Sequence, residues 1–150
     1  MADQQAIRSN ATRLLFVLLV PLALGVTECN SPQQDRILEL VNQTRAQHGL
    51  PALAQNPRLA LQADVWAERL AELGALSHSN GQGYIWETDP GTGGEIVGYG
   101  TSIEQVHQGY LNSPPHLANI LNPSFRSAGG GYAEAGGRVY TVVQFHSSTP

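Results

Sequence analysis

Two histidines and one glutamate, each beside turn-forming residues, are the side chains of this sequence best suited to chemistry. His78 lies between two serines, Glu95 follows two glycines, and His116 follows two prolines. Two imidazoles and a carboxylate suit Zn²⁺ with one coordination position left open for water or substrate. The three residues are far apart in the chain, so no local metal signature supports this set, and the metal site is a hypothesis.

Each of the three residues also has a structural interpretation. His78 could be a hydrogen-bonding residue at a loop tip, and Glu95 could be solvated or accept backbone N–H bonds from its own loop. His116 is expected near the start of a helix, where the helix dipole disfavours a positive charge. A neutral imidazole there fits a metal ligand, a general base or a structural residue.

Four further polar or aromatic residues are weaker candidates for a functional role. Ser113, close to His116, could be a nucleophile, but its position before two prolines favours an N-cap. Trp66 is expected to anchor the core rather than to stack on a ligand. His107 and His146 are expected to be ordinary surface or strand-edge residues.

The N-terminus has the pattern of a secretory signal. Arg8 and Arg13 precede an apolar run over residues 14–24, which is too short to span a bilayer. We therefore expect a signal peptide over residues 1–25, a short linker over 26–33 and one domain over 34–147; the alternative is an uncleaved anchor.

The composition narrows the class of partner and the location. Cys29 is the single cysteine, so the chain has no internal disulfide framework; it could be lipidated, although a free thiol or a tail residue is the simpler interpretation. The 150 residues carry a formal net charge of −4. Without a basic patch, nucleic acid and anionic membrane surfaces are poor partners. We expect a small, acidic, secreted or cell-envelope protein, held at a membrane only through an uncleaved N-terminus or a lipidated Cys29.

Helix signals divide most of the remaining chain. Ser31-Pro32 and Asn56-Pro57 each place a cap before a proline, and the two helices end near Gly49 and Gly74. A third helix is expected after Ser102, with Ile103, Val106 and Tyr110 on one face, and a short fourth one after Ser113. On the second helix the apolar face is expected to hold Leu59, Ala63, Trp66, Leu70 and Leu73.

Strand signals concentrate at the C-terminus. Residues 138–145 alternate and are rich in β-branched and aromatic side chains, residues 128–133 form a weaker glycine-rich strand, and Gly136-Gly137 predicts a tight hairpin turn. Residues 75–100 show no period and predict a long loop region. Because a two-stranded sheet is marginal, a third strand is expected within it. Helices followed by a hairpin indicate an α+β domain.

The order of these motifs resembles the CAP superfamily (cysteine-rich secretory protein, antigen 5 and pathogenesis-related 1) in its bacterial SCP-like form. The resemblance rests on Gly49-Leu-Pro-Ala-Leu53, Leu76-Ser-His78, Gly94-Glu95, Tyr110-Leu-Asn-Ser-Pro-Pro-His116-Leu-Ala-Asn-Ile-Leu and the final Val-Gln-Phe. It implies an α-β-α sandwich, with a central antiparallel sheet flanked by helices and an open cleft. In that family the cleft gathers two histidines and one or two glutamates and often binds a divalent metal, which assigns His78, Glu95 and His116 here.

The chain departs from the family pattern at four places near that cleft. Ile96 stands where an asparagine is usual, Tyr110 where a tryptophan is usual, and Leu117 where an arginine commonly follows the histidine. Ser113 occupies the place of the second cleft glutamate. These changes would weaken a metal site.

Two functions from different classes follow from the resemblance. In the first, the chain is an exported binding module for a small ligand, a lipid, a glycan or a peptide. In the second, it is a hydrolase of the peptidase type, assisted by a divalent metal, with His78 and His116 holding zinc and Glu95 as general base or third ligand. The sequence leaves open whether the chain is an enzyme, and a third interpretation is that these residues only brace the long loop.

Overall fold

The computed structural model describes residues 30–79 and 91–150. The expected signal peptide over residues 1–25 and Cys29 lie outside these ranges.

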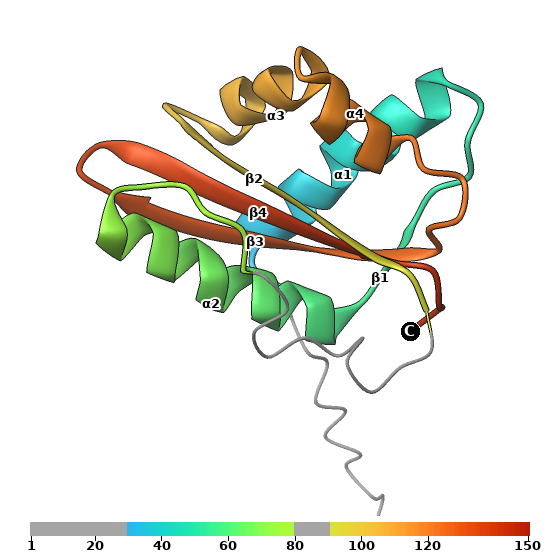
Figure 1. Cartoon of the computed structure of the whole chain (residues 1–150), viewed down its shortest axis with the longest axis horizontal. Coiled ribbons are helices and arrows are strands. Elements are labelled where there is room, and N and C mark those ends of the chain that lie inside the picture. Colours follow the sequence, from blue (N-terminus) through green and yellow to red (C-terminus); the bar gives the residue numbers. More distant parts are fainter. Residues whose placement is uncertain (1–29, 80–90) are drawn as a thin grey trace, which may run out of the picture.

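The described residues form three layers, with a sheet between helices (Figure 1). In chain order the elements are α1 (Pro32–Gln47), β1 (Ala54–Gln55), α2 (Pro57–Leu73), β2 (Gly93–Gly100), α3 (Ile103–Leu111), α4 (Pro114–Ile120), β3 (Ser127–Ala135) and β4 (Arg138–His146). Helix α2 covers one face of the sheet, and α1, α3 and α4 lie over the opposite face. The expected α-β-α sandwich is confirmed.

The long helices begin and end at the capping residues that the sequence predicts. Ser31 and Gln34 form a capping box at the start of α1, and the Asn56 side chain accepts from the backbone amides of Arg58 and Leu59 at the start of α2. Gly74 ends α2 in the left-handed conformation, with φ at 63°. These signals are local, so the sequence is sufficient to read them.

The sheet has the strand order β1-β3-β4-β2. The hairpin β3–β4 turns at Gly136 and Gly137, both with positive φ, as expected for a tight turn. The expected third strand is β2, which pairs antiparallel with β4 from Gly93 to Gly100. Two residues of β1 add a short parallel pairing to β3. As a result, β2 lies at one outer edge of the sheet.

Each face of the sheet has its own apolar core. Ile96, Val143 and Phe145 pack with α1 and α3, whereas Val97, Tyr140 and Val142 pack with α2. Neighbouring residues of β2 therefore face opposite helical layers, as the alternation of a strand requires.

The glycine-rich strand β3 permits α2 to approach the sheet very closely. A Cβ atom on Gly131 would lie 2.0 Å from the carbonyl carbon of Ala63, and one on Gly129 would lie 2.1 Å from the amide nitrogen of Ala60. These glycines are required by contact with the helix backbone rather than by a turn. For this reason the weak strand pattern of β3 is compatible with a central position in the sheet.

Four expectations about single residues are corrected by the structure. Leu73 is 53% exposed, because the buried face of α2 runs through Ala60, Ala63, Ala67 and Leu70 instead. Ser113 occupies the N-cap position of α4, but its side chain makes no capping hydrogen bond. His107 and His146 are buried rather than on the surface, because α1 covers the first and the C-terminal residues contact the second.

Candidate functional site

Glu95 is the most strongly held side chain of the predicted set. Its Oε1 accepts from His78 Nδ1 at 2.8 Å and from the backbone amide of Ser79 at 3.1 Å. Its Oε2 accepts from Ser79 Oγ at 2.8 Å and from Gln144 Nε2 at 3.4 Å. The Glu95 side chain is only 8% exposed. Glu95 is therefore not solvated; it fixes the segment that follows α2 against β2.

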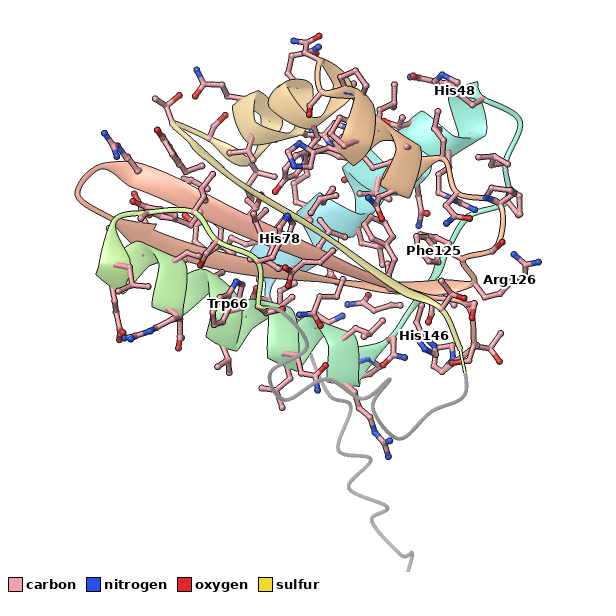
Figure 2. The ribbon with its side chains drawn as sticks, in the orientation of Figure 1. His48, Trp66, His78, Phe125, Arg126 and His146 are labelled. Carbon is pink, nitrogen blue, oxygen red and sulfur yellow. The ribbon has the colours of Figure 1, made fainter. Side chains whose placement is uncertain are left out.

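This arrangement assigns a proton to one nitrogen of His78. An ionised carboxylate only accepts hydrogen bonds, so His78 Nδ1 carries a hydrogen and Nε2 is the nitrogen directed elsewhere. The ring itself is 54% exposed. A second tie holds the same segment, because Trp66 Nε1 on α2 donates to the carbonyl of Ser77 at 2.9 Å (Figure 2). Trp66 thus packs partly on the α2 core, as expected, and also anchors the segment that carries His78.

His116 comes from the opposite helical layer. It lies in the first turn of α4, and its ring contacts Tyr110 edge-on, with the ring centroids 5.2 Å apart. Tyr110 is itself fixed, because its hydroxyl lies 2.9 Å from the carbonyl oxygen and 2.8 Å from Oγ1 of Thr141. The position of His116 is therefore set through α3 and β4.

Buried Arg45 fixes the other end of α4. Its guanidinium donates to the backbone carbonyls of Ile120 and Asn122 at 2.7 and 3.0 Å, and to that of Pro51 at 2.9 Å. Arginine suits this role because its several N–H groups diverge to separate acceptors. A helix of seven residues is thus held in place by tertiary hydrogen bonds at its C-terminal end.

Electrostatics favours a neutral His116. Partial burial lowers the pKa of His116, and the nearby His78 lowers it further. The expected neutral imidazole at this position also agrees with the positive end of the helix dipole.

The expected His₂Glu metal set does not fit these positions as a three-ligand site. Among the described residues, no group of three or more His, Cys, Asp or Glu side chains is placed to hold a metal ion. The reason lies in β2: Glu95 shares a face with Val97, which packs against α2, whereas His116 belongs to the α3–α4 layer. The oxygens of Glu95 are also already used by Ser79 and His78. Glu95 therefore orients His78, and two imidazoles remain as metal donors.

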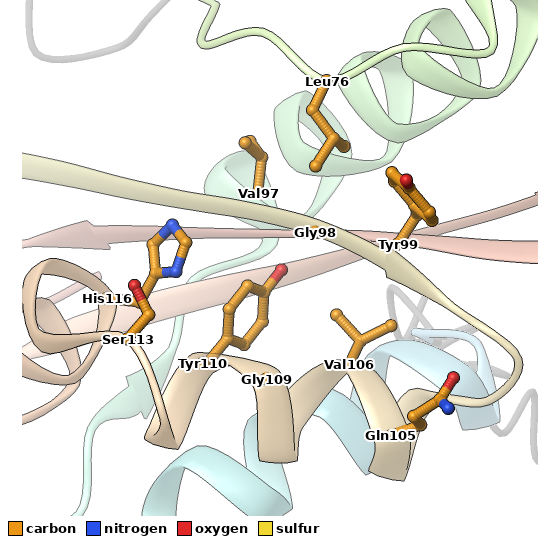
Figure 3. Close-up of a pocket in the computed structure, with 10 residues that line it drawn as sticks. All are labelled: Leu76, Val97, Gly98, Tyr99, Gln105, Val106, Gly109, Tyr110, Ser113 and His116. Carbon is orange, nitrogen blue, oxygen red and sulfur yellow. The ribbon is translucent and has the colours of Figure 1, made fainter.

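A groove of about 230 Å³ begins at His116 and Ser113 and runs past the outer edge of β2 (Figure 3). Val97, Tyr99 and Leu76 lie on one side of the strand, and Tyr110 and Val106 of α3 lie on the other. Leu76 and Tyr99 are 41% and 47% exposed, so they form an apolar rim. The sequence indicated a possible functional role for His116 and Ser113 but did not predict the rest of the groove. The groove forms only when α3 and the segment after α2 meet at β2.

Gly109 leaves the groove open on the side of α3. A Cβ atom at this position would meet nothing within 4 Å, and Gly109 is not among the glycines with positive φ. Neither packing nor a special backbone conformation therefore requires glycine here, although glycine in a helix costs about 1 kcal/mol relative to alanine. A side chain at this position would extend into open space beside the groove.

The sequence matches the model of one protein family, the cysteine-rich secretory protein family (CAP), over residues 38–145. The chain belongs to the CAP family. A relative, the uncharacterized protein YkwD of Bacillus subtilis (strain 168), is 29% identical over 114 residues, which cover 71% of this chain and 44% of the relative. The chain thus spans less than half of that relative's length.

Solved CAP structures share the fold. An outer surface protein of Borrelia burgdorferi is 21% identical with a TM-score of 0.66, over 77% of this chain and 92% of that one. An extracellular protein of Bacillus anthracis str. Ames with an SCP domain is 24% identical with a TM-score of 0.67, over 77% and 40%. In the described part of this CAP chain, no helix has the length and apolar character needed to cross a bilayer.

Proposed function

We propose that this CAP domain is an exported binding module whose groove holds part of a small ligand, lipid, glycan or peptide at the cell surface or outside the cell. The observation that carries the proposal is the groove along β2, which is lined mostly by apolar residues and has Gln105, Ser113 and His116 as its polar side chains apart from the tyrosines. Export is supported by the apolar run at residues 14–24 and by relatives described as extracellular or outer-surface proteins.

The apolar and the polar residues of the groove would have different roles in binding a ligand. Val97, Leu76 and Val106 remove apolar ligand surface from water, which contributes roughly 25 cal/mol per Å² buried. His116, Ser113 and Gln105 supply the few polar side chains that fix the orientation of a ligand in an apolar site. Glu95 acts through His78, by holding its ring in one orientation.

A pair of leucine substitutions on α3 tests the groove. Gly109→Leu would fill it, whereas Gln108→Leu adds a leucine to the exposed neighbouring position of the same helix. Binding of palmitate, a chitin oligosaccharide and an extended hexapeptide is measured by calorimetry on the full chain. We expect at least one probe to bind the wild type and Gln108→Leu, and to bind Gly109→Leu at least about tenfold more weakly. If no probe distinguishes the two variants, the groove is not the binding site.

Metal-assisted hydrolysis is the second candidate function. One feature favours it, namely that partial burial lowers the pKa of His116 and so biases this imidazole towards the neutral form that a metal ligand requires. The bonds made by Glu95 oppose it, so two imidazoles would have to hold zinc without a third protein ligand. The test is thermal unfolding with Zn²⁺ and with chelator, beside His116→Ala. A zinc-dependent rise that the variant loses would support a metal site, since a ligand of the native state must stabilise it; no rise in the wild type would remove this candidate.

A further inference from the structure

Among the described residues, the outer edge of β2 has backbone groups without hydrogen-bond partners. In that part of the chain β2 pairs with β4 alone, because it is the last strand in the order β1-β3-β4-β2. Within the part of the chain that the structure describes, the backbone of residues 96–100 makes no hydrogen bond other than those of this pairing. On an edge strand every second residue directs its N–H and C=O outward. This edge can therefore accept a further strand.

The groove lies along this same edge. Val97, Gly98 and Tyr99 are the consecutive residues of β2 that line it. Figure 3 shows the strand crossing the groove, with Leu76 on one side and Val106, Gly109 and Tyr110 of α3 on the other. A chain lying in the groove would run beside the edge of the strand, with its alternate side chains directed towards Leu76 and towards Gly109.

The size of the groove selects among occupants. Pockets that enclose a whole drug-sized ligand measure roughly 300–1,000 Å³, and this groove offers about 230 Å³. It has room for one or two side chains of a longer molecule rather than for a complete lipid. A lipid tail or a sugar would also leave the backbone groups of β2 without matching partners in register, whereas an extended peptide supplies them.

The charges at the groove's margins narrow the peptide further. Its lining residues include no Asp, Glu, Lys or Arg. Beside it, the guanidinium of Arg138 lies 4.9 Å from the ring centroid of Tyr99. The nearby carboxylate, Glu95, is turned to the α2 face and used in hydrogen bonds. Complementary charge therefore favours an uncharged centre with acidic flanks.

We propose that the groove binds an extended peptide that pairs with the outer edge of β2 as an additional strand, with an uncharged side chain above Gly109 and an acidic residue beside Arg138. This inference rests on the proposed function and names its ligand class.

Backbone methylation provides a direct test. The probe is a fluorescein-labelled hexapeptide, Glu-Thr-Val-Thr-Val-Glu with blocked ends, and anisotropy is measured on the full chain. Two derivatives carry N-methyl groups on alternate amides, offset by one residue. A bound strand turns one set of amides to β2 and the other to solvent, so we expect one derivative to bind at least about tenfold more weakly and the other within about threefold of the parent. Equal binding of both derivatives would overturn the proposal.

Variants separate this proposal from the broader one. Gly109→Leu should lose the hexapeptide while Gln108→Leu retains it, and a lysine-flanked hexapeptide should bind more weakly than the glutamate-flanked one. If palmitate or the oligosaccharide binds and is lost in Gly109→Leu while the hexapeptide does not bind, the groove function stands and the peptide assignment is wrong. If no probe responds to Gly109→Leu, both are wrong.

Discussion

Glu95 joins two segments that meet only in the folded chain. It receives the ring of His78 and both the amide and hydroxyl of Ser79, and its own carboxylate is almost fully buried. Hydrogen bonds to charged groups contribute about 1.5–3 kcal/mol each when removal leaves a buried partner unsatisfied. Glu95 is thus a structural centre that holds the segment after α2 against β2.

Replacing this carboxylate tests that role. We expect Glu95→Gln to lower the free energy of unfolding by about 2 kcal/mol, because the neutral amide accepts less strongly and puts an N–H group against one of these donors. Urea denaturation measures the change. The control is Glu72→Gln, which removes a 69% exposed carboxylate from a surface ion pair with Arg69 and should cost under about 1 kcal/mol. Equal costs for the two variants would contradict a bracing role for Glu95.

His107 makes the stability of the protein depend on pH. Its Nε2 lies 2.9 Å from Thr44 Oγ1. Because the single hydroxyl hydrogen of Thr44 is donated to the carbonyl of Leu40, Thr44 Oγ1 accepts from His107. In the neutral ring Nε2 therefore carries the hydrogen and Nδ1 carries none. Burial lowers the pKa of His107, and nearby Arg36 lowers it further. The unfolded chain therefore takes up this proton first as the pH falls below about 6.5, and stability is lost from there down to the lowered folded pKa.

The variant His107→Gln removes this titration and keeps a hydrogen-bonding side chain. We expect its urea midpoint to change less than that of the wild type between about pH 7.5 and pH 5. Burial lowers the pKa of His116 in the same direction, so His116→Gln should remove a separate share of the slope. A variant of His107 with the wild-type slope would show that its burial is not linked to folding.

At the scale of elements, Gly109 lowers the helix propensity of α3 and leaves the groove open on that side. Gly109 is exposed in the last turn of the nine-residue helix α3, with open space where its Cβ would lie. Gly109→Ala should therefore raise the free energy of unfolding by about 0.5–1 kcal/mol, as measured by denaturation. A destabilised Gly109→Ala would mean that the glycine serves the fold rather than the groove.

The corresponding substitution on β3, Gly131→Ala, should lower the free energy of unfolding instead of raising it. A Cβ on Gly131 would overlap the backbone of Ala63 in α2, which cannot move aside as a flexible side chain can. We expect Gly131→Ala to cost at least about 1–3 kcal/mol, the usual range for overpacking. The pair of alanine variants thus separates a glycine kept for packing from one kept for open space.

At the scale of the whole molecule, the sequence predicts what local chemistry decides. The caps at Ser31 and Asn56, the stop at Gly74 and the turn at Gly136-Gly137 need only neighbouring residues, and all four are confirmed. The position of β2 could not be read in the same way, because its four glycines hide the alternation of a strand.

The candidate site also combines features that the sequence predicts with features that depend on tertiary structure. The types of His78, Glu95 and His116 mark them as candidates; the structure joins His78 to Glu95 by a hydrogen bond and places His116 in the lining of the groove. Their separate roles depend on tertiary geometry, since the face of β2 that carries Glu95 and the layer that carries His116 are fixed only when the sheet forms. The burial of His107 is hidden for the same reason, because it requires α1 to cover α3.

Chemical-shift mapping tests the central claim, that the groove along β2 is the binding site, most directly. The ¹⁵N-labelled full chain is titrated in turn with palmitate, the chitin oligosaccharide and the glutamate-flanked hexapeptide, and amide shifts are followed by two-dimensional NMR. We predict that the largest shifts fall on residues 97–99 of β2 and 105–116 of α3 and α4, and that the hexapeptide produces them. Largest shifts on the outer face of α2, around exposed Leu61 and Val65, or no shifts with any probe, would contradict the account.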